Sequence, residues 1–278
     1  MKLVYENERG KVVMKGGGSD TFNITQIKGI SLPENDASTI RYPDVAGQTV
    51  IKTSLMERMI TISADVRDKN RKHIADALSI FSSPGAIYIT SFGKTKKIYG
   101  RCVSFEANKA KGAYIPFTVQ FCADNPYFLD IYETKTDICL RNSLLKSPFV
   151  LGCRFSERTL KNNVINHGDI SVEPVFEISS LDGISCPSGI VIRNLTNGNT
   201  ITLNTDILPD EVITVDIKNR KITSSKRGNL ISCVAQENSL SRFLLDIGVS
   251  SVEILAIGAT GELTAKCIHN NSYISAVV

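Results

Sequence analysis

The histidines are the first residues to test for metal or acid–base chemistry, and the chain has three of them: His73, His167 and His269. A zinc site needs three or four ligands close together, and no two of these histidines lie four residues apart. Each stands beside polar or turn-forming residues, so we expect solvated side chains rather than ligands. The sequence therefore predicts neither a metal site nor a bound cofactor.

The nucleophiles and carboxylates also fall short of a catalytic arrangement. The chain has no GxSxG motif, and Cys102 and Cys122 fit strand positions better than an activated thiol, although only the fold decides whether a cysteine meets a histidine. Glu173 and Glu177 share one face of an expected strand, where four residues separate them by roughly 13 Å. Glycosidase carboxylates lie about 5–9.5 Å apart. We therefore predict no catalytic residues and no enzymatic activity.

Glycine-rich and basic segments give no stronger signal for phosphate or nucleic acid. The segment "GGGSD" at 16–20 precedes a strand-like stretch, whereas a phosphate-binding loop opens a helix. The basic clusters at 67–72 and 93–97 are short, and the net charge of the 278-residue chain is only +4. Solvated turns and loop tips explain all three segments. Nucleic-acid binding is not predicted from the charge.

Composition indicates a globular protein with no membrane span. Hydrophobic residues make up 42% of the chain and charged residues 22%, which is ordinary for a soluble domain. No run approaches the 18 apolar residues that a transmembrane helix requires. The seven cysteines include no CxxC pair, so we expect buried thiols in a protein folded in a reducing cytosol.

The elements that would position any site are mainly strands. Apolar residues alternate with polar ones, which predicts strands with one buried face, over residues 60–66, 170–178, 213–217 and 252–256. Hairpins are predicted at Asn197-Gly198 and, more weakly, at Asn219-Arg220. A third hairpin is expected between 96–106 and 113–122. One helix is predicted within 68–85, with Ile74, Ala77, Leu78 and Phe81 on one face.

The stretch "VQFCADNPYF" at 119–128 marks the end of the first half. An alternating strand stops at Asp124-Asn125-Pro126, and two aromatic residues, Tyr127 and Phe128, follow directly. Either these rings pack under the last hairpin and fix how the chain leaves the domain, or they begin a connecting strand. The sequence leaves both interpretations open.

Periodicity divides the chain into two domains. It is strong up to about residue 130, weak from 131 to 165, and strong again in short strands with turns from 166 to 278. We predict an α+β domain over 1–130, a connecting segment over 131–165, and a β-sandwich or barrel over 166–278. The overall fold class is mainly β.

The order and spacing of these segments resemble the distal tail proteins of long-tailed (siphovirus-type) bacteriophages. The stretches that carry the resemblance are "FNITQIKGI", the long loop "LPENDASTIRYPDVAGQTV", "RMITISADV", "KNRKHIADALSIF", "FTVQFCADNPYF", "NHGDISVEPVFEI", "IVIRNLTNGNTITLN", "EVITVDIKNRKITS" and "GVSSVEI". The resemblance implies a tail-tube-like β-barrel or sandwich with one helix over 1–130 and a galectin-like jelly roll over 166–278. It implies no catalytic residues.

The resemblance also implies a role and partners. Proteins of this family form a hexameric ring at the tail tip of the virion, after synthesis in the cytoplasm of the bacterial host. The ring joins the tail tube protein to the tail-tip protein, and receptor-binding proteins dock on the second domain in some relatives. DNA passes only as cargo, and no membrane insertion is expected. A barrel that is not fully closed would leave strand edges for neighbouring copies.

Residues 31–50 are the candidate segment for contact between copies. This loop is longer than most connections in a compact domain, and it carries Ile40, Tyr42, Pro43 and Val45 among polar residues. Two other readings stay open: a β-sandwich protein that binds host polysaccharide, and a glycosidase. The chain has no Trp, which weakens the carbohydrate-binding interpretation. It also lacks a carboxylate pair at the required distance, which weakens the glycosidase interpretation.

Overall fold

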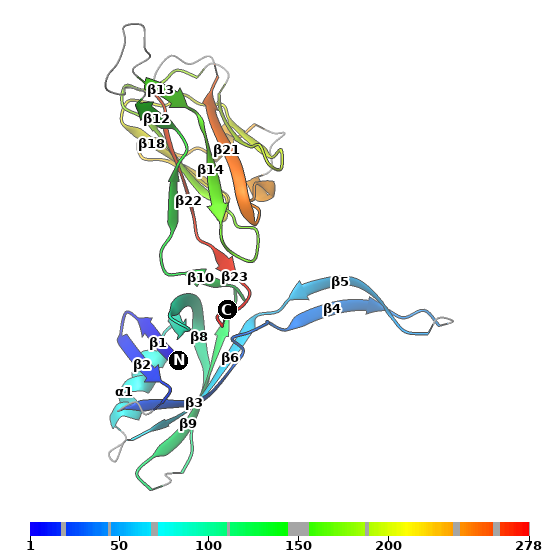
Figure 1. Ribbon diagram of the computed structural model, residues 1–278, viewed down its shortest axis with the longest axis vertical. Coiled ribbons are helices and arrows are strands. Elements are labelled where there is room, and N and C mark those ends of the chain that lie inside the picture. Colours follow the sequence, from blue (N-terminus) through cyan, green and yellow to red (C-terminus); the bar gives the residue numbers. More distant parts are fainter. Residues whose placement is uncertain are drawn as a thin grey trace. The chain divides into compact units, whose positions relative to one another are not determined.

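The chain folds into two compact units. The computed structural model describes residues 1–17, 21–43, 46–67, 72–109, 112–143, 156–186, 189–235, 240–257 and 262–277. The first unit comprises Met1–Ile131 together with Tyr273–Val278, and the second comprises Tyr132–Ser272 (Figure 1). The second unit is therefore an insertion ahead of the last residues of the first.

The first unit is a closed seven-stranded β-barrel. Around the barrel the strands are β1 (Lys2–Asn7), β2 (Gly10–Lys15), β3 (Phe22–Lys28), β6 (Arg58–Val66), β9 (Ile115–Ala123), β8 (Lys94–Ala107) and β7 (Gly85–Ser91), which pairs with β1 again. Neighbours are antiparallel except β2 and β3, which meet in parallel at Lys15 and Asn23. The expected barrel is confirmed, but closure leaves its seven strands without the free edges that we expected to drive assembly.

Alternating side chains fill the barrel, and one helix covers it. Every second residue of β6 and of most of β9 is buried, as the period of two predicts. Helix α1 (Lys72–Phe81) contacts β1 and β2 (Figure 1) and buries Ile74, Ala77 and Phe81. Leu78, which the sequence placed on the same face, is 42% exposed. The buried stripe of this helix is thus narrower than its apolar pattern.

The aromatic residues behind Pro126 combine the two interpretations of the sequence. Phe128 is fully buried and belongs to the core of the first unit, whereas Tyr127 is half-buried. Phe128 is also the first residue of a short strand, β10 (Phe128–Asp130), which pairs with β8. The C-terminal strand β23 (Ser272–Tyr273) lies next to β10 in the same sheet. The chain therefore leaves and re-enters the first unit on neighbouring strands.

The second unit is a β-sandwich. One sheet contains, in order, β11 (Thr134–Asp137), β22 (Thr264–His269), β15 (Val175–Ser180), β18 (Glu211–Asp216), β19 (Lys221–Ser224) and β20 (Gly228–Asn229). The other contains β14 (Lys161–Asn166), β21 (Gly248–Ala256), β16 (Ile190–Asn194) and β17 (Thr200–Leu203). Buried residues of both sheets form one core. Two short 3₁₀ helices, Ile231–Cys233 and Leu240–Arg242, follow β20.

The segment 131–165 is not a simple connection. It supplies β11 and β14, an edge strand of each sheet, and β12 (Leu140–Ser143), which pairs with β13 (Ser156–Thr159). The expected boundary at the C-terminus also differs, because Tyr273–Val278 belong to the first unit rather than the second. The edge strands β11 ("TKTD") and β14 ("KNNVIN") have few apolar residues. Their alternation is therefore too weak to predict them as strands.

The predicted hairpins are present. β16 and β17 pair on either side of Asn197-Gly198, with Gly198 at φ +77°. β18 and β19 turn at Arg220, which adopts φ +52° although it is not glycine. β8 and β9 form the long hairpin of the first unit.

A buried ion pair stabilises the β18–β19 hairpin of the second unit. The carboxylate of Glu211 is fully buried and accepts hydrogen bonds from Arg227 Nε (2.7 Å) and Nη2 (2.9 Å), from the Leu208 backbone N–H, and from the Ser224 hydroxyl. Burial alone raises the pKa of Glu211, but these hydrogen bonds and the positive charge of Arg227 outweigh it and lower the pKa overall. The charged form of Glu211 therefore stabilises the fold.

We expect Glu211→Gln to lower the free energy of unfolding of the second unit by about 2–3 kcal/mol at pH 7, since Arg227 loses its partner. A depressed folded pKa gives stability that is present above the unfolded pKa, about 4.3, and is lost as the pH falls through the folded value. The difference between variant and wild type should shrink below about pH 4. Calorimetry at several pH values measures it.

The matched control is Glu253→Gln. Glu253 lies 3.6 Å from Arg193 in an ion pair whose side chains are partly exposed, and such pairs contribute at most about 1 kcal/mol. An equal effect of the two substitutions at pH 7 would contradict the role given to Glu211.

Candidate functional site

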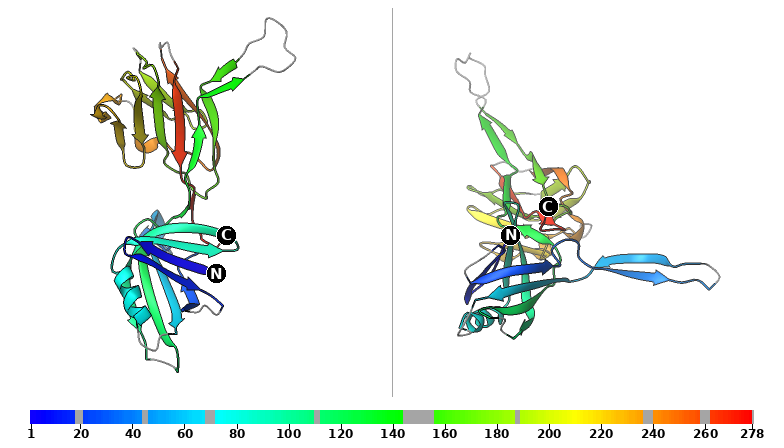
Figure 2. Two further views of the ribbon diagram at one scale, coloured as in Figure 1. Left: turned by 90° about the vertical axis from the view of Figure 1, so that its left-hand side faces the viewer. Right: turned by 60° about the horizontal axis from the view of Figure 1, so that its bottom comes forward.

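The most distinctive surface of the first unit is an exposed two-stranded hairpin. Strands β4 (Asn35–Ile40) and β5 (Thr49–Leu55) pair only with each other among the strands of the described residues. We call residues 35–55 the arm. In the right-hand view of Figure 2 the arm, drawn in lighter blue, extends away from the barrel strands. All of β4 is exposed, and so is β5 up to Leu55.

Apolar side chains are prominent on the arm. The exposed fractions are 42% for Ile40, 54% for Tyr42, 54% for Val50 and 61% for Ile51. None of these residues belongs to the core of the first unit. An isolated two-stranded hairpin is at best marginally stable in water, so the arm would gain stability from any surface that covered it.

The predicted contact residues lie at and near the end of the arm. Ile40 is the last residue of β4 and pairs with Thr49, and Tyr42 and Pro43 follow in the connection, where Tyr42 is exposed. Val45 lies outside the described residues. The prediction of a loop over 31–50 is wrong in one respect, because much of this segment is a regular hairpin.

The second strand of the arm was not predicted from the sequence. Val50 and Ile51 are more exposed than Ile40, and the pairing shifts by one residue between Ser38 and Thr39, opposite them. Such a bulge bends a strand and raises its twist. The signal that was available is the run "TVIKTSL", whose β-branched residues favour a strand.

A buried arginine fixes the base of the arm. Arg58, three residues after the arm, is 1% exposed. Its guanidinium donates to backbone carbonyl oxygens of three separate chain segments: Nε to Pro126 (2.6 Å), Nη1 to Gly29 (2.8 Å) and Ser31 (3.0 Å), and Nη2 to Ile274 (2.6 Å). One side chain thus joins the entrance to the arm, the exit towards β10 and the returning C-terminal segment.

The surroundings of Arg58 explain why a charge is tolerated there. The guanidinium carbon lies 4.6 Å from the centroid of the Phe128 ring, within the range of a cation–π interaction. Burial lowers the pKa of Arg58 to about 10, so the group stays charged at neutral pH. Its planar fork of donors suits several carbonyls at once, which a lysine cannot match.

The residues considered for chemistry remain dispersed. His73 and His167 are exposed, as expected, but His269 is 3% exposed and its Nε2 lies 3.1 Å from the Ile165 carbonyl oxygen. The expectation that it is solvated is therefore wrong. Within the described ranges, no three His, Cys, Asp or Glu residues are grouped so that they could hold a metal ion.

Of the helices that the structure describes, none combines the length and the apolar character needed to cross a bilayer.

Comparisons with known proteins reveal a shared fold. No family model and no curated protein sequence matches the chain. The structure is similar to the crystal structure of the Dit protein of phage SPP1, described as a paradigm of the hub adsorption apparatus in phages that infect Gram-positive bacteria. The TM-score is 0.66 at 12% identity, over 91% of this chain and 94% of that one.

A second similarity is to a chain of the phage P2 baseplate in its activated conformation with Ca. Its TM-score is 0.50 at 10% identity, over 96% of this chain and 97% of the other. Identities this low establish likeness of fold rather than of function. Over more than nine-tenths of its length, the chain shares the architecture of these phage hub and baseplate proteins.

Proposed function

We propose that the protein is a structural component of a bacteriophage tail tip. In this proposal it forms a ring, most simply of six copies, that joins the tail tube protein to the tail-tip and host-attachment proteins. The ring lies at the virion tail tip, after synthesis in the host cytoplasm. The similarity of fold to phage hub and baseplate proteins supports this assignment.

The observation that carries the proposal is the unpartnered arm. The barrel is closed, so its strands have few hydrogen-bonding groups left to offer. The arm instead has two free edges and exposed apolar residues. A neighbouring copy can cover these side chains and pair with an edge, which is a common mode of protein recognition. Because the contact is made by different surfaces of two identical chains, it closes into a ring or continues as a filament.

The second unit is assigned the docking of other tail proteins. We propose a galectin-like sandwich there, in line with the resemblance of the sequence. Carbohydrate binding is the alternative function, but Phe176 and Phe243 are fully buried and stack edge to face inside the core. Sugar sites usually offer exposed aromatic faces, and these two rings do not.

Removal of the arm tests the ring. A chain in which Asn-Gly replaces residues 36–54 keeps the first pair of the hairpin, Asn35 with Leu55, and an Asn-Gly turn suits two paired strands. We expect this chain to keep the thermal stability of the barrel and to lose rings in mass photometry and electron microscopy. The measurement uses protein at tens of micromolar, alone and with the tail-tip protein.

A point variant refines the test. Ile40→Asp with Val50→Asp should weaken assembly at least tenfold, because two charges replace apolar contacts. The control Ser38→Asp with Ser54→Asp adds the same charges at exposed polar positions of the same strands and should have a much smaller effect. Rings of unchanged size without the arm would contradict the proposal and strengthen the carbohydrate-binding alternative.

A further inference from the structure

The turn between β7 and β8 contains Phe92 in a backbone conformation that is unfavourable for a phenylalanine. Phe92 and Gly93 form this turn, with φ values of +49° and +81°. Residues with positive φ in such hairpin turns are usually Asn, Asp or Gly, because a side chain is strained there. Phe92 is also 90% exposed. Its ring therefore gains almost no burial within the chain to compensate for the strained backbone.

Three basic residues lie at the same end of the barrel strands as Phe92. Lys2 and Lys15 face each other across β1 and β2, and Lys94 begins β8 directly after the turn. All three are exposed. Like charges that face each other across two strands are unfavourable in isolation. Phe92 is therefore an exposed apolar knob at the end of the barrel that also carries these three lysines, which we call the rim. This end of the barrel suits an acidic partner with an apolar recess.

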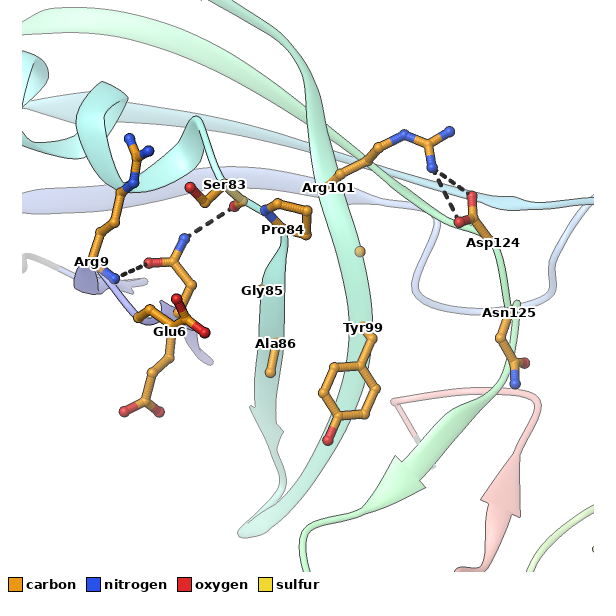
Figure 3. A pocket seen from close by; sticks show the side chains of 13 residues that line it. Glu6, Arg9, Ser83, Pro84, Gly85, Ala86, Tyr99, Arg101, Asp124 and Asn125 are labelled. Atoms are coloured by element: carbon orange, nitrogen blue, oxygen red, sulfur yellow. Dashed lines mark hydrogen bonds and ion pairs between the residues drawn. The ribbon is translucent and has the colours of Figure 1, made fainter. Parts of the chain in front are cut away.

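A groove with acidic and apolar residues lies away from the Phe92 turn, towards the opposite end of β1 and β7. It has a volume of about 880 Å³ and runs over the last residues of β1, the first residues of β7 and the middle of β8 (Figure 3). Its floor is made of small residues, since Gly85 pairs with Gly100, and Ala86 lies between Glu6 and Tyr99. The Tyr99 side chain is 58% exposed and offers an aromatic wall.

The groove is acidic on one side. Glu6 and Glu8 line it, and no ion pair among the described residues engages either carboxylate. The other groove carboxylate, Asp124, is bound by Arg101 at 2.9 Å (Figure 3). Arg9 is held by the end of α1, through Ser79 and Ser82. Lys11 faces Glu6 across β1 and β2, but neither Glu6 nor Glu8 is held in an ion pair among the described residues, so both carboxylates can be approached by an external cation.

We propose that Phe92 of one copy inserts into this groove of a second copy. The phenyl ring of Phe92 would pack against Tyr99 and the small residues of the groove floor, and the lysines of the rim would approach Glu6 and Glu8. The knob and the groove lie at opposite ends of β1 and β7, so the contact is head-to-tail and can repeat around a ring. The inference rests on the proposed function, because both require copies of this chain to meet.

Phe92→Asn separates assembly from folding. Asn favours the positive φ of this turn, so the variant should melt at the same temperature as wild type or higher. Without the phenyl side chain of Phe92, the apparent dissociation constant of the assembly should rise at least tenfold in mass photometry. Unchanged assembly of this variant would overturn the proposal.

A photo-cross-linker identifies the partner. Benzoyl-phenylalanine at position 92 should link two copies, and mass spectrometry should place the link within residues 6–9, 83–86, 99–101 or 124–125 of the second, which line the groove. The same probe at Leu181, which is 77% exposed, is the control and should give no such link. No chain-to-chain link from position 92, or a link only to another tail protein, overturns the inference. Loss of rings without the arm would still support the proposed function in that case.

Discussion

Replacing Arg58 with methionine should destabilise the first unit by about 3–5 kcal/mol, the range for removing one partner of a buried charged network. Methionine fills much of the volume but donates no hydrogen bond. The carbonyl oxygens of Gly29, Ser31, Pro126 and Ile274 then lose their donor, and each buried unpaired carbonyl costs about 1–3 kcal/mol. For a unit of this size the melting temperature should fall by roughly 10–17 °C.

Two further variants calibrate this result. Arg58→Lys keeps the charge without the planar fork, so it should lose less stability than methionine. Arg101→Met removes an arginine whose ion pair with Asp124 is largely exposed, and it should cost at most about 1 kcal/mol. A melting temperature of Arg58→Met equal to that of Arg101→Met would show that the buried network does not hold the unit together.

The position of Arg58 illustrates what the sequence could predict. Ile60, Ile62, Ala64 and Val66 alternate, and the sequence predicted a strand with this row buried, which is confirmed. Arg58 has the same parity as this row and is buried with it, although arginine is usually exposed. The pattern therefore contained the signal for a buried arginine. Its partners lie far away along the chain, so no local pattern identifies them.

Other features were predictable only where one face of an element is buried. The barrel strands and the sandwich strands alternate, and the fold class followed from that. The arm buries neither face, so its residues show no regular alternation and resembled a loop. The return of Tyr273–Val278 to the first unit depends on contacts with residues far away along the chain, such as Arg58 and Lys96, which periodicity does not report. Phe92 was not singled out from the sequence, because neither its positive φ nor its exposure follows from a residue pattern.

The arm would contribute to assembly in a different way from the knob and the groove. The arm is joined to the barrel at the level of Arg58, whereas Phe92 and the groove are parts of the rigid barrel itself. A hairpin that is only marginally stable alone orders as it binds, which lowers the net gain from its contacts. A knob on a rigid barrel loses little freedom on binding. Assembly would therefore depend on both, with the arm adding area and the knob fixing the geometry.

Gly29→Ala should be comparably damaging to the first unit, at about 2–4 kcal/mol from strain and overpacking combined. Gly29 has φ +83°, and a Cβ atom there would lie 1.9 Å from the Met59 carbonyl oxygen and 3.2 Å from the Ile60 Cα. Both atoms belong to the backbone of β6, so they cannot move without disturbing the pairing of β3 with β6. The Gly29 carbonyl also accepts a hydrogen bond from Arg58.

Gly93→Ala is the matched control for this prediction. Gly93 has nearly the same φ, +81°, but nothing lies within 4 Å of its added Cβ, so only the strain of about 1 kcal/mol applies. Chemical denaturation of both variants gives the difference that is due to the clash with β6. Because Gly29 and Arg58 are in direct contact, the double variant Gly29→Ala with Arg58→Met should lose less stability than the two single losses combined. Equal stability of Gly29→Ala and Gly93→Ala, or strict additivity with Arg58→Met, would contradict the view that one buried network ties the entrance of the arm to the barrel.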